Sequence, residues 1–169
     1  LGELVEAFET TAADLVAARG GRLIKTLGDE VLYVADDAGT AAEIALRLVE
    51  TLADDETMPE LRVGMAFGTV TTRMGDVFGT TVNLASRLTS IAPRDAVLVD
   101  SAFAEELIRT GLAPASEAEA AEAAAAAEKE GRTPPVYRFA LQPTWQRPVR
   151  GLGLVAPWLL SRRDGATAS

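Results

Sequence analysis

The stretch that decides the fold is RLIKTLGDEVLYVA, residues 22–35. Two short apolar runs, Arg22–Leu27 and Val31–Ala35, stand on either side of a Gly-Asp pair, and this pattern predicts a β-hairpin. The hairpin also carries charge, because Lys25 lies inside the first apolar run and Asp29 lies in the turn. Burying a charged side chain without a partner is costly, so these two residues are candidates for a functional role.

Amphipathic helices are predicted on both sides of this hairpin. In Glu3–Ala18 the apolar residues recur at helical spacing, and Gly20-Gly21 then ends the helix. Ala38–Ala53 has apolar residues at positions i, i+4 and i+8, which form one stripe along a second helix. The first third of the chain is therefore expected to form a helix, a hairpin and a helix.

The next segment, Leu61–Phe67, alternates bulky residues with small or polar ones. This period of two predicts a strand with one bulky face and one nearly bare face, and another element should lie close against the bare face. Gly68–Asp76 is expected to turn back as a second hairpin, and Thr81–Ser90 to form a third helix. The remaining predicted elements are a strand at Ala96–Val99, a helix at Ser101–Arg109 and closing strands at Val136–Leu141 and Val155–Leu160. This order predicts an α+β fold, a mostly antiparallel sheet with helices packed on it.

The composition limits the chemistry that the chain can perform. With 169 residues, 48% of them apolar, the chain is long enough for one globular domain with its own core. It contains no cysteine and no histidine, which excludes disulfides, Cys/His zinc sites and Ser-His-Asp triads. Any chemistry must therefore depend on Asp, Glu, Lys, Arg, Asn or hydroxyl groups.

The charge pattern argues against a nucleic-acid partner. The formal net charge is -9, and binding to phosphates needs clustered Lys and Arg that this chain lacks. Much of the acid lies in the Ala/Glu-rich stretch Ser116–Glu130, which is expected to be a solvated helix or insert. No apolar run approaches the roughly 20 residues of a membrane span, and the N-terminus lacks the layout of a signal peptide. We therefore expect a cytoplasmic protein with no membrane span.

A second polar motif lies in GDVFGTTVNLASRL, residues 75–88. If the chain is helical from Thr81 onward, Asn83 and Arg87 are at positions i and i+4 and project from one face of that helix. Two exposed polar residues without a function would be the ordinary interpretation if this helix stood alone.

The two motifs together resemble the class III nucleotide cyclases. Lys25 to Asp29 follows the pattern K-T-x-G-D, and Asp76 to Arg87 follows D-x-(aromatic)-G-x-x-V-N-x-A-S-R. The resemblance extends from about Leu1 to Leu107 and is greatest to the bacterial adenylyl cyclases, whose single catalytic domain forms a homodimer. It implies a ferredoxin-like core, which agrees with the predicted layering of helices on an antiparallel sheet.

The resemblance implies a role for each motif residue. Lys25 and Asp76 would recognise the purine, Asp29 would bind metal, Asn83 would orient the ribose, and Arg87 would stabilise the reacting α-phosphate. The substrate would be ATP, because adenine offers an amino donor to a carboxylate and a ring acceptor to an ammonium, whereas guanine reverses both. The intact site would hold two Mg²⁺ or Mn²⁺ ions, and it would lie at a two-fold interface that combines residues of both protomers.

The chain also departs from the family pattern. Family members carry a first metal-binding aspartate on a strand that precedes the helix at Glu3, so the resemblance implies a cyclase domain truncated at its N-terminus that turns over slowly or not at all by itself. The expected organisation is a cyclase domain at residues 1–112, an acidic insert at 113–135, and closing strands with a tail at 136–169. A regulatory domain is expected upstream.

Two alternatives remain open. One is a catalytically silent module for nucleotide binding or dimerisation. The other is a diguanylate cyclase, which also has a Gly-Asp-Glu hairpin. Against the second, Gly28 follows Leu27 where that family has another glycine, and Glu30 precedes Val31 where it has an aromatic residue.

Overall fold

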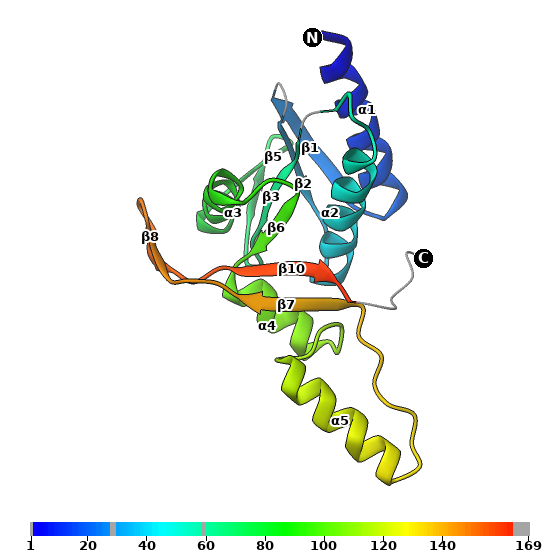
Figure 1. Ribbon diagram of the computed structural model, residues 1–169. Helices are drawn as coiled ribbons and strands as arrows, with labels where there is room; N and C mark the ends of the chain where they lie inside the picture. The colour runs from blue at the N-terminus through cyan, green and yellow to red at the C-terminus, as the bar shows by residue number, and fades with distance from the viewer. Residues whose placement is uncertain (1, 28–29, 59, 164–169) are drawn as a thin grey trace.

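The computed structural model describes residues 2–27, 30–58 and 60–163, and it has an α+β architecture (Figure 1). The helices are α1 (Gly2–Ala18), α2 (Ala38–Ala53), α3 (Thr80–Ile91), α4 (Ser101–Arg109) and α5 (Glu117–Lys129). The strands are β1 (Arg22–Leu27), β2 (Glu30–Val34), β3 (Arg62–Met65), β4 (Thr71–Arg73), β5 (Asp76–Phe78), β6 (Ala96–Val99), β7 (Phe139–Pro143), β8 (Arg147–Val149), β9 (Gly153–Val155) and β10 (Trp158–Arg162).

The strands pair mostly in the antiparallel sense, as predicted. Within the described residues, the largest sheet has the order β3-β6-β10-β7. Its β3–β6 pair is parallel because α3 crosses over between these two strands, and its other pairs are antiparallel. The hairpins β1–β2, β4–β5 and β8–β9 are antiparallel and form separate two-stranded sheets.

Helices cover both faces of the larger sheet. Helices α2 and α4 pack with Val97 and Val99 of β6 in one buried cluster, whereas Leu98, between them, packs with α3 on the opposite face. This arrangement follows from the alternation of side chains along a strand. Helix α1 packs on α2 and on the β1–β2 hairpin through Ala12 and Val16. Among the described residues, the hairpin therefore packs against helices, and none of its strands pairs with the larger sheet.

The bare face predicted for β3 is confirmed at Gly64. A Cβ atom on this glycine would lie 2.6 Å from the carbonyl oxygen of Ala85 and 2.6 Å from the carbonyl carbon of Leu88. Both atoms belong to the backbone of α3, so only glycine allows this helix to lie directly on the strand. This contact sets the distance at which α3 packs on β3.

The second predicted hairpin is present, with strands at 71–73 and 76–78 around a two-residue turn. Its turn residues, Met74 and Gly75, both have positive φ values, 51° and 79°. Two such residues match the right-handed twist of a tight hairpin. The turn brings Asp76 to the start of β5.

The two closing strands begin later than predicted. Val136 is 81% exposed and lies outside β7, after Pro134 and Pro135, which cannot donate backbone hydrogen bonds to a ladder. Val155 belongs to β9, in a β8–β9 hairpin that the sequence pattern did not predict. Pro157 separates this hairpin from β10, because its nitrogen has no hydrogen to donate.

The acidic stretch forms a helix, α5, that extends away from the sheet (Figure 1). Its cap is Ser116, which accepts a hydrogen bond of 3.1 Å from the amide of Glu119. Arg163, just after β10, forms an ion pair of 2.7 Å with Glu117 and stacks on Tyr137. Among the described helices, none combines the length and apolar character that crossing a bilayer requires.

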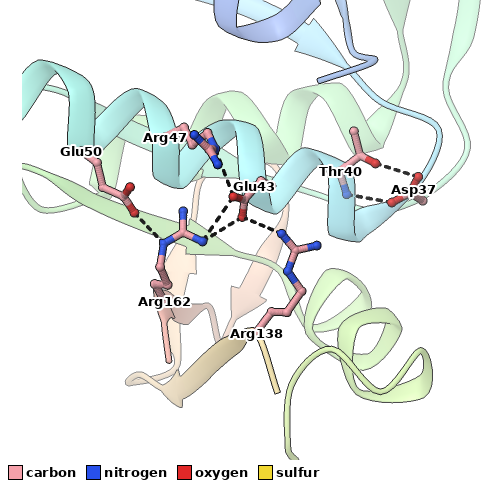
Figure 2. A network of polar contacts seen from close by, with 7 residues as sticks. All are labelled: Asp37, Thr40, Glu43, Arg47, Glu50, Arg138 and Arg162. Atoms are coloured by element: carbon pink, nitrogen blue, oxygen red, sulfur yellow. Dashed lines mark hydrogen bonds and ion pairs between the residues drawn. The ribbon is translucent and has the colours of Figure 1, made fainter. Parts of the chain in front are cut away.

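A buried acid ties α2 to the last strand (Figure 2). Glu43 is only 4% exposed, and its carboxylate lies 3.0 Å from Arg162, 3.1 Å from Arg47 and 3.4 Å from Arg138. Arg162 also contacts Glu50 at 2.8 Å. Burial opposes ionisation of Glu43, but the hydrogen bond and charge of Arg162, followed by those of the other arginines, lower its pKa overall. The cluster therefore stays charged and fixes β10 against the helix.

Candidate active site

Lys25 and Asp76, which are 51 residues apart in the sequence, meet in the structure. The Nζ atom of Lys25, on β1, lies 2.9 Å from Oδ2 of Asp76, at the start of β5. The register of β1 and β2 shifts between Leu23 and Lys25, which is an irregularity of the β-bulge kind. Such bulges re-aim side chains at functional sites. The irregular register thus accounts for a lysine that leaves the apolar face of its strand to meet a carboxylate.

The Asp76 carboxylate is held in one orientation. Its Oδ1 atom accepts a hydrogen bond of 2.8 Å from the amide of Val77, while Oδ2 accepts from Lys25. These two contacts, first that of Lys25 and then that of Val77, lower the pKa of Asp76. The Lys25 and Asp76 side chains are 41% and 32% exposed, so both remain accessible to a ligand. The pair offers a fixed donor beside a fixed acceptor.

Asn83 and Arg87 lie on the exposed side of α3. Leu88 is fully buried and turns the opposite side of the helix toward the sheet. Both polar residues are exposed, and within the described part of the chain neither side chain has a hydrogen bond or an ion pair. Both side chains therefore point away from the sheet, on the exposed side of α3.

A groove of about 720 Å³ lies along β2 and β3, and one residue of each motif, Lys25 and Asn83, is part of its lining. Consecutive residues at 30–35 and 60–67 line it, together with Lys25 and Asn83. Among the described residues, β2 pairs only with β1, and β3 only with β6, so one edge of each strand is unpaired. Asp76 does not line the groove itself, but it contacts Lys25, which does. Arg87 is not part of the lining. The structure therefore brings Lys25 and Asp76 into contact, whereas Asn83 only shares the groove lining with Lys25, and Arg87 lies one helical turn further along α3.

The predicted metal ligand, Asp29, lies outside the described residues. Elsewhere in the described chain, no three acidic side chains come close enough together to hold a metal ion. The neighbouring Glu30 is exposed and lines the groove. The described residues alone do not form a metal site.

The groove also contains residues that the sequence pattern does not mark as functional. Tyr33 lines it, and its hydroxyl donates to the carbonyl of Ala41 at 2.9 Å and lies 3.4 Å from Sδ of Met65. Burial raises the pKa of this phenol, so it stays protonated. Phe67, which follows β3, forms another part of the wall. Alternation along their strands predicts only that such residues pack, because it gives no information about a groove between two strands.

Known proteins resemble this chain in sequence and in fold. Residues 2–124 match the family model of the adenylate and guanylate cyclase catalytic domain. An adenylate cyclase of Streptomyces coelicolor is 88% identical over 98% of this chain and 43% of the relative, and one of Streptomyces griseus is 74% identical over 100% of this chain and 45% of the relative. The crystal structure of the adenylyl cyclase CyaB from P. aeruginosa, at 16% identity, superposes with a TM-score of 0.70 over 99% of this chain and 85% of that one, which shows the shared fold.

The chain belongs to the adenylate and guanylate cyclase catalytic domain family. This confirms the resemblance to class III nucleotide cyclases and the expected α+β fold. Cyclase domains of this class bind nucleotides, act as dimers and use divalent metal ions. The chain spans less than half the length of the two Streptomyces relatives.

Proposed function

We propose that this domain converts ATP into 3′,5′-cyclic AMP and pyrophosphate. In this reaction the ribose 3′-oxygen forms a bond to the α-phosphorus, the bond from that phosphorus to the leaving pyrophosphate breaks, and the hydroxyl proton is lost to solvent. Nucleophile and electrophile belong to one molecule, so the protein mainly has to fold the substrate and neutralise developing charge. The observation that carries the proposal is the contact between Lys25 and Asp76, two residues from separate motifs.

The Lys25 and Asp76 pair is proposed to read the purine. Adenine has an amino donor at N6 and an acceptor at N1, which complement a carboxylate and an ammonium. Because the amide of Val77 holds one oxygen of Asp76, the carboxylate keeps its acceptor geometry when the nucleotide arrives. Guanine would place a carbonyl against the carboxylate and an N–H against the ammonium, which leaves both contacts unpaired. This argument favours ATP over GTP.

Asn83 and Arg87 are proposed to act on the sugar and the phosphates. The amide of Asn83 would orient the ribose, and the guanidinium of Arg87 would donate to the α-phosphate as charge develops there. The outward placement of both side chains on α3 supports a site that a second copy of the chain completes. Under two-fold symmetry each homodimer would contain two equivalent sites.

The metal requirement is proposed from the family. Asp29 would be one ligand of Mg²⁺ or Mn²⁺, with two ions in the complete site. When bound, such ions lower the pKa of the attacking hydroxyl and neutralise charge on the triphosphate. We further propose a cytoplasmic setting, where ATP is available, and regulation by an upstream domain in a full-length protein.

The test is an exchange of the purine-reading groups. The full-length protein and the 169-residue chain are incubated with ATP or GTP and Mn²⁺, and products are separated into cyclic mononucleotide, cyclic dinucleotide and unreacted substrate. We expect cyclic AMP, with greater turnover from the full-length protein. The double variant Lys25→Glu with Asp76→Lys reverses donor and acceptor and should shift the ATP-to-GTP ratio of kcat/KM by about tenfold or more toward GTP.

A matched control uses another exposed ion pair. Glu130 and Arg132, which lie 2.6 Å apart, have side chains that are 59% and 57% exposed. Exchanging their charges should leave the nucleotide preference unchanged. An unchanged preference in the Lys25 and Asp76 variant would refute the purine assignment. Binding of ATP without any product would favour a silent nucleotide-binding module, and a cyclic dinucleotide would favour a diguanylate cyclase.

A further inference from the structure

A buried carboxylate outside the groove has no role in the chemistry proposed above. Asp100 lies between β6 and α4, and only 8% of it is exposed. Its Oδ1 atom accepts a hydrogen bond of 2.9 Å from the amide of Phe103, which is the usual contact of a helix cap. Burial raises the pKa of Asp100, although the amides of Phe103 and Phe67 favour its charged form. A serine caps α5 at Ser116, so a helix cap alone does not explain a buried acid.

The same carboxylate oxygen makes a second, distant contact. Oδ1 of Asp100 also accepts a hydrogen bond of 3.1 Å from the amide of Phe67, 33 residues earlier in the chain. The backbone amide of Asp100 donates to the carbonyl of Met65 at 3.1 Å. These two bonds tie the end of β3 and the start of the following loop to the first turn of α4. A cap needs only the contact with Phe103.

The loop held in this way touches the helix that carries the second motif. Phe67 lines the groove together with Asn83. The next two residues contact the first turn of α3: a Cβ atom on Gly68 would lie 2.6 Å from Oγ1 of Thr81, and that hydroxyl donates to the carbonyl of Thr69 at 2.9 Å. A displacement of this loop would therefore shift the first turn of α3, and Asn83 would move with it.

We propose that Asp100 is a positioning residue for the cyclase reaction. By holding Phe67 and Phe103 on one oxygen, it fixes the loop at residues 66–70 against the first turn of α3. It thereby sets where Asn83 and Arg87 stand relative to the groove. This inference rests on the proposed function, because Asn83 and Arg87 have their roles only in that reaction.

Two substitutions distinguish the helix-capping contact of Asp100 with Phe103 from its second contact with Phe67. Asp100→Asn keeps an oxygen that can accept from both amides. Asp100→Ser keeps a capping hydroxyl, but its side chain is one atom shorter and withdraws from Phe67. Ser116→Ala removes a cap of the same kind on α5, which lies outside the groove, and serves as the control.

The first measurement is amide hydrogen exchange of the 169-residue chain by NMR, which needs no activity. Asp100→Ser should speed exchange at Phe67 by about tenfold, the loss of one hydrogen bond, while Asp100→Asn and Ser116→Ala leave it within about threefold. An unchanged exchange rate at Phe67 in Asp100→Ser would overturn the proposal.

The second measurement is steady-state kinetics of the full-length protein, corrected for the folded fraction. Asp100→Ser should lower kcat about tenfold with little change in KM for ATP, and Asp100→Asn should restore kcat. If exchange at Phe67 rises but kcat is unchanged, the positioning role is wrong while the proposed function stands. If the wild-type protein forms no cyclic AMP, the proposed function and this role in it both fail, while the exchange result still decides whether Asp100 holds the loop.

Discussion

Replacing Gly64 with alanine tests the close packing of the α3 backbone on β3. The added Cβ would lie 2.6 Å from Ala85 O and Leu88 C, and closer still to the amide nitrogen of Thr89. Real Cβ atoms essentially never approach another heavy atom within 3.0 Å, and these neighbours are backbone atoms that no rotamer change can move. The helix must therefore retreat by more than 0.4 Å, the difference between 3.0 and 2.6 Å, because the amide nitrogen of Thr89 is nearer than either of these two atoms.

The expected magnitude follows from this forced movement. Overpacking of a core contact costs about 1–3 kcal/mol of unfolding free energy. For a chain of this size each kcal/mol lowers Tm by about 2–4 °C, so Gly64→Ala should lower it by about 2–12 °C. Since a 1 Å misplacement can cost about 100-fold in rate, the shift of Asn83 and Arg87 should lower kcat by at least about tenfold. KM for ATP should change less, because Lys25 and Asp76 lie on other elements.

The assay combines calorimetry of the chain with steady-state formation of cyclic AMP by the full-length protein. Gly2→Ala is the control, because a Cβ there has no neighbour within 4 Å. An unchanged Tm for Gly64→Ala would refute the close seating of α3 on β3. A lower Tm with unchanged kcat per folded molecule would instead refute the link between the position of α3 and catalysis.

Three further predictions concern other parts of the fold. Glu43→Gln should lower stability by about 3 kcal/mol, because it leaves Arg162 buried beside an uncharged group, and chemical denaturation would measure the loss. The pKa of Glu43 is lowered in the folded state, so its contribution is present above the unfolded pKa near 4.5 and is lost as pH falls through the folded value; an equally acid-sensitive Glu43→Gln variant would contradict this. Tyr33→Phe should cost about 1 kcal/mol by removing the hydrogen bond to Ala41, and a change below about 0.3 kcal/mol in urea unfolding would show that water replaces the hydroxyl. Replacing residues 116–131 with a short Gly/Ser linker should leave the rate of cyclic AMP formation within about twofold, because α5 contributes no residue to the groove, and a loss of activity in an otherwise folded variant would assign the acidic helix a role.

Local sequence patterns determined most of the elements. The bounds of α2, β6 and α4 agree with the prediction at both ends, and Asp37 and Asp100 cap the two helices. These elements depend on periodicity and on capping groups that act within a few residues, so the sequence alone specifies them. The bare face of β3 was predicted in the same way, because a glycine in an alternating strand leaves space for a neighbour.

The sequence pattern was less informative where a strand depends on its partners. The β8–β9 hairpin and the late start of β7 were missed. Leu154 of β9 is 66% exposed, and Val136, which was predicted to begin a closing strand, is 81% exposed and lies outside β7. An apolar residue therefore did not by itself mark the bounds of these strands. Their positions depend on hydrogen-bonded registers with segments elsewhere in the chain, such as Trp158 opposite both Val99 and Pro143.

For the candidate site, the sequence determined which residues form the two motifs, and the family resemblance assigned their roles. Only the tertiary structure decided that Lys25 meets Asp76 at 2.9 Å, that Asn83 shares a groove with Lys25, and that Asp100 holds Phe67. Each of these contacts joins residues more than 30 positions apart or elements with no shared periodicity. Side-chain spacing encodes the face on which a residue lies, whereas the packing of helices and hairpins decides which faces meet.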